Sequence, residues 1–143
     1  MKMKIFKKIT FLIILFSSFN EQKSLSKNDV IDFMNEYFEK VKQNNFSLIE
    51  PYYSETFYEN VDKEKWEELF TKIHSTLGPL ILIEVESWNI NSSISTSGSG
   101  KNYKFVYNNK YENGNIKETV CLYLPNGSTK LKITKHNFTS NIF

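Results

Sequence analysis

The side chains in this sequence that are best placed to bind a ligand or take part in catalysis are three polar residues on the predicted last strands: Asn109, Glu118 and Lys135. Two Asn-Gly pairs, at 113–114 and 126–127, each separate alternating apolar and polar residues and predict two-residue hairpin turns. Such turns would place the three polar side chains next to one another on an otherwise apolar sheet face. A carboxylate and an ammonium in those surroundings could form the floor of a small polar pocket.

These turns imply a register that can be checked pair by pair. The first turn predicts the pairs Tyr103 with Leu124, Phe105 with Leu122, Tyr107 with Val120, and Asn109 with Glu118. The second turn predicts the pairs Leu122 with Leu131, Val120 with Ile133, and Glu118 with Lys135. The opposite face then carries lysines around a weakly apolar centre: Lys104, Lys110, Lys117, Lys130 and Lys132 around Val106, Cys121 and Tyr123.

Two functional readings of the polar row stay open. In a non-enzymatic binding or accessory domain, the ligand-binding candidates are Tyr53, Asn109, Glu118 and Lys135, and the partner is a small apolar molecule or a protein. In an isomerase-like or hydratase-like enzyme, Glu118 is the candidate base and Tyr107 or Tyr53 donates a hydrogen bond. The simplest alternative is a Glu118–Lys135 ion pair at the wet end of the sheet, worth about 0 to 1 kcal/mol. No complete catalytic constellation is visible, which favours the binding domain.

The two histidines and the single cysteine are weaker candidates. His74 lies just off the apolar stripe of a predicted helix, as a surface or boundary residue. His136 would lie opposite Lys117 on the lysine-bearing face, a poor setting for a metal ligand. Cys121, on the same face, is expected to be structural rather than a reactive thiol. No Cys/His group has the spacing of a zinc site, so we expect no metal and no cofactor.

Helical patterns occupy the first part of the chain after residue 25. Ser26 and Asp29 form a capping-box pattern, and Asp62 is a predicted N-cap. The two helices that follow these caps each carry one apolar stripe, made of Val30, Met34, Tyr37, Phe38 and Val41 in the first and Trp66, Leu69, Phe70, Ile73 and Leu77 in the second. Gly78 and Pro79 end the second of them. Between the two, residues 45–54 predict a short helix and residues 55–60 a short strand.

After Pro79 the apolar period changes to two, which predicts strands. Residues 80–90 form one strand whose inward residues change parity between Val85 and Trp88, which indicates a bulge. Residues 91–100 are a polar turn or a weak edge strand. Together the patterns predict an α+β fold in one domain over residues 26–140, with N-terminal helices on a curved antiparallel sheet of about four strands.

The N-terminus has the layout of a secretory signal peptide over residues 1–20. Lysines precede an apolar run from Ile9 to Phe16, and small and polar residues follow it. The run is roughly half of the 20 apolar residues that a bilayer span needs, so cleavage between Ser18 and Ser24 is favoured over an uncleaved anchor. We therefore expect an exported protein, periplasmic or secreted, with no stable membrane span. Cys121 lies far from the apolar run, which argues against a lipoprotein.

The charge pattern narrows the possible partners. All basic residues are lysines, and without arginine the chain lacks the bidentate donor that nucleic-acid recognition uses, so no nucleic acid is expected. Loss of residues 1–20 with their four lysines would change the formal net charge from +2 to −2. The lysine-bearing sheet face is either solvated or, through Val106, Cys121 and Tyr123, a contact in a homodimer.

Over roughly residues 28–140 the pattern resembles the nuclear-transport-factor-two-like, cystatin-like α+β cone, and more narrowly small exported bacterial domains of that superfamily. The resemblance is carried by the "LGPL" helix end, the "SW" strand, the segment "YKFVYNNKYENGNIKETVCLYLPNGSTKLKI", and the positions Trp66, Trp88, Tyr107, Tyr111, Gly114 and Glu118. It implies helices packed against a curved sheet. Members include isomerases, dehydratases, transport adaptors and accessory domains, so the resemblance does not define an activity. The Asp base with a Tyr and Asp oxyanion pair of ketosteroid isomerases has no clear match here.

Overall fold

The computed structural model describes residues 24–95 and 98–140, and its first helix begins at the predicted capping box. The Ser26 hydroxyl accepts a hydrogen bond from the Asp29 amide at 3.2 Å, and the Asp29 carboxylate accepts one from the Ser26 amide at 2.7 Å. Helix α1 spans Lys27–Lys42 and buries the five predicted residues of its apolar stripe. The predicted signal peptide, residues 1–20, lies outside the described residues.

Short helical segments connect α1 to the next long helix. Helix α2 (Phe46–Ile49) leads into a 3-10 turn, η1 (Glu50–Tyr52), and then into helix α3 (Glu55–Asn60). The prediction of a strand at 55–60 is wrong. The Ser54 hydroxyl accepts a hydrogen bond from the Phe57 amide at 3.1 Å, and this N-cap outweighs the weak strand preference of six residues.

Helix α4 (Lys63–Leu77) agrees with its sequence pattern. The Asp62 carboxylate caps it by accepting from the Lys65 amide at 3.0 Å. Gly78 ends it with a φ of +75°, a left-handed conformation that favours glycine. Leu69 of the predicted stripe is half-buried, and the other four members are buried, namely Trp66, Phe70, Ile73 and Leu77.

Five antiparallel strands follow, rather than about four. The single strand predicted at 80–90 is divided into β1 (Leu80–Leu82) and the start of β2 (Val85–Ser95), which both pair with β3 (Gly98–Tyr111). The register is irregular between Val85 and Ser87, so the predicted bulge is confirmed. The serine-rich segment contributes to an edge strand. Strands β4 (Gly114–Pro125) and β5 (Lys132–Thr139) complete the order β1-β3-β4-β5, with β2 beside β3.

The pairing between β3 and β4 is shifted by two residues from the predicted one, because the turn lies one residue earlier in the chain. Tyr103 pairs with Leu122 and Tyr107 with Glu118, and the turn is formed by Glu112 and Asn113. Asn113 lacks the positive φ that a turn centred on Asn-Gly requires. The turn is instead held by the end of α4, because the Glu112 and Asn113 amides donate to the carbonyls of Pro79 and Leu77 at 3.0 and 2.8 Å. A shift of two keeps each side chain on its predicted face.

The β4–β5 register is also wrong in the prediction, and here the faces change. Leu122 pairs with Ile133, Val120 with His136, and Glu118 with Phe138. The connection after Asn126 is longer than a two-residue turn, and β5 has a bulge at Thr134, opposite the Cys121–Leu122 step of β4. The bulge moves His136 to the core face and Lys135 to the outer face.

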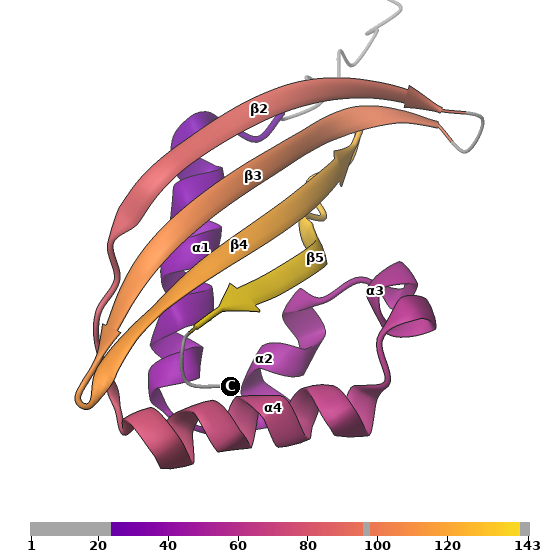
Figure 1. The fold of residues 1–143 in the computed structure, drawn as a ribbon. Coiled ribbons are helices and arrows are strands. Elements are labelled where there is room, and N and C mark those ends of the chain that lie inside the picture. The colour runs from indigo at the N-terminus through magenta and orange to yellow at the C-terminus, as the bar shows by residue number, and fades with distance from the viewer. Residues whose placement is uncertain (1–23, 96–97, 141–143) are drawn as a thin grey trace, which may run out of the picture.

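The helices all lie on the concave side of the curved sheet, and the convex side is uncovered (Figure 1). Side chains from the helices and from β1, β3, β4 and β5 fill the space between the two layers. Strand β2 contributes none of these buried hydrophobic residues. One hydrophobic core joins the described helices and strands, as expected of a unit that folds on its own. Among the described helices, none combines the length and apolar character of a membrane span.

Candidate functional site

Glu118 lies at the centre of a buried polar cluster. Its Oε1 accepts a hydrogen bond from Asn109 Nδ2 at 3.0 Å and from the Tyr111 hydroxyl at 3.4 Å. Its Oε2 lies 3.0 Å from His136 Nε2. Asn109 and Glu118 are therefore together, as predicted, although their strand register differs, and His136 takes the place predicted for Lys135.

Two tyrosines extend this cluster toward the helices. The Tyr53 hydroxyl lies 2.9 Å from His136 Nδ1, and the Tyr37 hydroxyl lies 2.8 Å from that of Tyr53. Tyr37 comes from α1 and Tyr53 follows η1, so the chain of hydrogen bonds crosses from the helical layer to β4 and β5. We name the six residues that it joins the buried polar network: Tyr37, Tyr53, Asn109, Tyr111, Glu118 and His136.

The buried polar network is closed to solvent. Glu118 is 2 % exposed and His136 6 %, and Asn109 is fully buried. A carboxylate in such a place is tolerated when hydrogen-bond donors surround it and a cationic or polar partner is next to it. The Glu118–His136 contact supplies that partner. The geometry fits a structural cluster that fixes the positions of α1, β4 and β5.

The tyrosines around Glu118 are hard to ionise. Burial raises the pKa of the Tyr37 and Tyr111 phenols well above the usual value of 10.0, and the Glu118 carboxylate raises it further. Burial also raises the pKa of Tyr53 and Tyr107. All four phenols are therefore neutral hydrogen-bonding or packing groups at ordinary pH.

This pattern predicts a loss of stability at high pH. The folded-state pKa values of these phenols lie above the unfolded value of 10, so the folded state keeps protons that the unfolded state loses. Stability is therefore intact below pH 10 and falls as the pH rises above it, by about 1.4 kcal/mol per pH unit for each such phenol. We expect circular dichroism to show cooperative alkaline unfolding that coincides with the main rise in tyrosinate absorbance.

The variant Tyr37→Phe provides the control, because it removes one raised pKa. Above pH 10, the unfolding free energy should then fall less steeply with pH, by about 1.4 kcal/mol per pH unit, the contribution of one phenol. If most tyrosinate absorbance rises before the circular dichroism changes, these phenols are accessible in the folded state and the description of the site is wrong.

The structure places the remaining predicted site residues elsewhere. Tyr107 is 2 % exposed and packs in the core, with its ring centroid 4.8 Å from that of Phe38. Lys135 is exposed on the convex face opposite Cys121, so the predicted Glu118–Lys135 pair is wrong. The bulge at Thr134 in β5 is the reason, because it reverses which side chains of β5 face the core beyond this point.

The two histidines are both more buried than predicted. His136 does not lie on the lysine-bearing face but points into the core. His74 is 7 % exposed, its Nδ1 lies 3.0 Å from the Phe70 carbonyl oxygen, and its ring packs on Tyr111. Cys121 is a free, partly exposed strand cysteine. The apolar residues Ile133 and Phe138 on either side of His136 were the available signal for its inward direction, but only together with a bulge.

The surface pockets do not expose the carboxylate. A pocket of about 440 Å³ between α3 and the β4–β5 connection includes Tyr53, but the hydroxyl of Tyr53 is engaged in the interior with Tyr37 and His136. Glu118 is absent from the lining of five surface pockets in the described part of the chain. A substrate would therefore need a large opening of the core to reach it.

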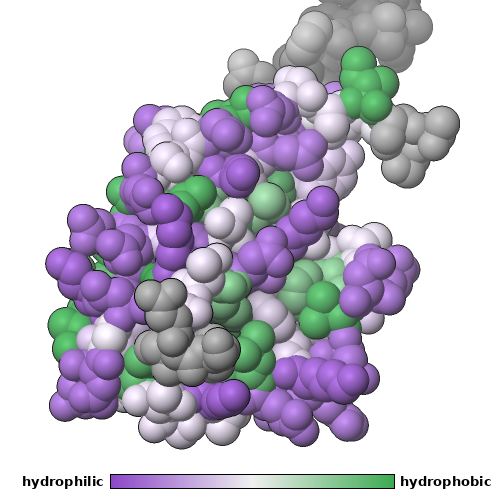
Figure 2. Space-filling view, in the orientation of Figure 1, coloured by the Kyte–Doolittle hydropathy of each residue, from purple (hydrophilic) through white to green (hydrophobic). Residues whose placement is uncertain are grey.

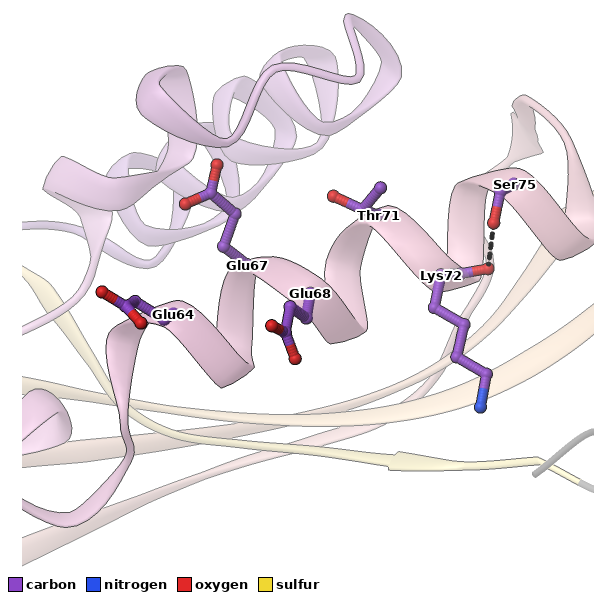
Figure 3. A pocket seen from close by; sticks show the side chains of 6 residues that line it. All are labelled: Glu64, Glu67, Glu68, Thr71, Lys72 and Ser75. Carbon is purple, nitrogen blue, oxygen red and sulfur yellow. Dashed lines mark hydrogen bonds between the residues drawn. The ribbon is translucent and has the colours of Figure 1, made fainter.

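A shallow hollow of about 520 Å³ lies along the outer side of α4. Its lining is polar and mostly acidic, and consists of Glu64, Glu67, Glu68, Thr71, Lys72 and Ser75. Figure 3 shows these side chains spread around the helix rather than converging on one point, with the Ser75 hydroxyl bonded to the Lys72 carbonyl oxygen at 3.1 Å. The arrangement is that of a solvated helix face.

Within residues 24–95 and 98–140, no group of three or more His, Cys, Asp or Glu side chains could hold a metal ion. The fold and the site together define an α+β domain with a curved, open antiparallel sheet and a sealed polar core. No protein-family model matches the sequence, and comparisons with curated proteins and with solved structures found no significant match.

Proposed function

We propose that this protein is a non-enzymatic, exported domain that binds a protein partner through its β1–β2 edge. The observation that supports this is the position of the exposed apolar residues. Among the described residues, the large hydrophobic side chains with high exposure all lie on β1 and β2: Ile81, Leu82, Val85, Trp88, Ile90 and Ile94. Exposed apolar side chains concentrated along one edge of a sheet in this way are typical of protein interaction sites.

The surface is prominent in the shape of the molecule. Strands β2 and β3 extend beyond β4 and β5 as an arm (Figure 1). Figure 2 shows a small hydrophobic surface near the end of this arm, and Ile94 of β2 is 92 % exposed. We name the exposed residues Trp88, Ile90 and Ile94 the β2 apolar row. An edge strand with such a row offers both backbone hydrogen bonds and apolar contacts to a partner.

A protein partner fits better than a small apolar ligand. The interior is filled by aromatic and aliphatic side chains, and the hollow along α4 is lined by polar and charged residues. The alternative of an isomerase or hydratase requires access to Glu118, which is 2 % exposed and bonded to three neighbours. We therefore favour binding over catalysis.

The convex face is the second surface considered for a partner. Two of its lysines are engaged within the sheet, since Lys117 pairs with Glu86 at 2.9 Å and Lys110 with Glu84 at 3.6 Å. Val106 and Cys121 between them are only partly exposed. This face therefore offers a partner less apolar contact than the β2 apolar row.

Photo-cross-linking of the full chain in its export host tests the proposal. A benzophenone side chain at position 90 should form a covalent adduct, and the added substitution Trp88→Lys in the probe-bearing chain should abolish it. The same probe at Asn137, exposed on the other edge, is the matched control. Equal adducts at both positions, or none at position 90, would rule out the β1–β2 edge as the binding surface.

The proposal also includes export of the protein and a relation to a known structural superfamily. The lysine-led apolar run before residue 20 supports export. The order of helices followed by a curved antiparallel sheet supports a relation to the nuclear-transport-factor-two-like cones. Recovery of the mature N-terminus between Ser18 and Ser24 from an exported fraction would support the first of these.

A further inference from the structure

Strand β2 is an open edge of the sheet. It pairs with β3 without interruption from Ser87 to Ser95, and its other side has no strand partner in the described part of the chain. At the opposite edge, β5 is partly covered, because the Ser54 amide donates to the Ile133 carbonyl at 2.9 Å and Tyr53 forms a bridge with Ile133. Strand β2, with 11 residues, is about twice the usual strand length.

This edge lacks the usual protection against strand pairing. Natural edge strands carry charges, prolines or bulges that discourage a neighbour. Residues 87–95 contain no lysine, aspartate, glutamate or proline, and the irregular register lies before them, at Val85. By contrast, β5 carries the exposed lysines Lys132 and Lys135.

The charge pattern points to a second copy of the same strand as the partner. A charged peptide would find no complementary charge along residues 87–95. Two copies of this strand, in contrast, can pair antiparallel in any register without opposing like charges. The pairing is also symmetric, so the two molecules form a closed dimer instead of an open chain.

The alternation of side chains selects the register. Trp88 pairs with Phe105 and Ile90 with Tyr103, which are core-facing residues of β3, so the β2 apolar row lies on the concave side. A twofold axis at Asn91 places the Trp88 of each copy opposite Ile94 of the partner subunit. This pairing covers the most exposed hydrophobic residue, Ile94, with an aromatic ring, a favourable cross-strand combination.

We propose that two copies of this protein associate through antiparallel pairing of their β2 strands about Asn91, which joins their two sheets into one. This inference rests on the proposed function, because it names the partner of the same surface. It also predicts which residue of β2 meets itself across the axis.

Cysteine cross-linking of residues 21–143 tests this register, in a Cys121→Ser background that removes the native thiol. The variant Asn91→Cys should form a disulfide-linked dimer within minutes of diamide addition, because directly opposed strand residues have Cα atoms about 4.5 to 5.5 Å apart, within disulfide range. The variants Asn89→Cys and Ser93→Cys lie on the same face but oppose each other rather than themselves, so each alone should cross-link at least tenfold more slowly. Preferential cross-linking at either control position would overturn the register.

Sedimentation equilibrium tests the association itself without any cross-link. The unmodified domain should show the mass of a dimer, and Asn91→Lys, which opposes two lysines at the axis, should show the mass of a monomer. The matched variant Asn137→Lys on β5 should remain a dimer. A monomeric unmodified domain at 1 mM would overturn the inference, while adducts between the probe at position 90 and a different protein would leave the proposed function intact.

Discussion

The variant His136→Leu is expected to lower the free energy of unfolding by about 3 to 5 kcal/mol, because it leaves the Glu118 carboxylate buried without its histidine partner. Glu118 is 2 % exposed and lies 3.0 Å from His136 Nε2. The substitution also removes one of the two partners of the Tyr53 hydroxyl, which lies 2.9 Å from His136 Nδ1. Urea denaturation of residues 21–143, followed by circular dichroism, measures the loss.

Two further variants distinguish this cause from a general effect of changing β5. Lys135→Leu changes the neighbouring residue, which is exposed on the convex face, and should alter stability by no more than about 0.5 kcal/mol. The double variant Glu118→Leu/His136→Leu removes both polar groups and should be less destabilised than the two single losses added together. Additive losses would mean that the two side chains do not depend on each other.

The outcome also bears on function. A network whose disruption mainly lowers stability holds α1, β4 and β5 in place, and this role accounts for a buried carboxylate without any substrate. The helical layer depends on it through Tyr37 and Tyr53. An enzyme with Glu118 as its base would need the same carboxylate to be reachable.

The helices could be predicted because their signals are local. The Ser26–Asp29 capping box, the Asp62 cap and Gly78 each act within one helical turn, and the apolar stripes follow directly from residue spacing. Helix α3 was missed although Ser54 precedes it as a cap, because six residues carry too little periodicity to separate a helix from a strand.

The sheet could be predicted in class but not in register. The β3–β4 turn is positioned by hydrogen bonds to the carbonyls of Leu77 and Pro79, which are more than 30 residues away along the chain. The β5 bulge at Thr134 depends on packing between strands and has no glycine or proline to mark it. The error in the β3–β4 register left every side chain on its predicted face of the sheet. The error in the β4–β5 register moved side chains of β5 to the other face.

The difference between an even register shift and a bulge also explains which residues of the buried polar network could be predicted. Asn109 and Glu118 were brought together correctly because an even shift keeps their faces. His136 was missed because one bulge exchanged it with Lys135. Tyr37 was predicted as a core residue of a helix, but its hydrogen bond to Tyr53 depends on how the helical layer rests on the sheet, which local sequence patterns do not contain.

The variant Trp66→Ala is expected to cost about 3 to 5 kcal/mol of unfolding free energy. Trp66 is 7 % exposed, and its ring stacks on Phe138 of β5 with centroids 5.4 Å apart. It also meets Phe57 of α3 at 5.2 Å and His136 at 5.3 Å. Removing the indole would leave a cavity where α4, α3 and the sheet meet, and guanidinium denaturation measures the loss.

The second tryptophan provides the matched control. Trp88 of β2 is 37 % exposed, and its ring stacks near that of Phe105. Lys27 Nζ lies over the Trp88 ring, 4.1 Å from its centroid. Its removal should cost about 1 kcal/mol of stability, mainly the cation-π contact, yet it should abolish dimerisation and cross-linking at position 90. If instead Trp66→Ala is nearly neutral, α4 does not pack on β5 as described. If Trp88→Ala costs as much as Trp66→Ala, β2 belongs to the core and is not a free binding edge.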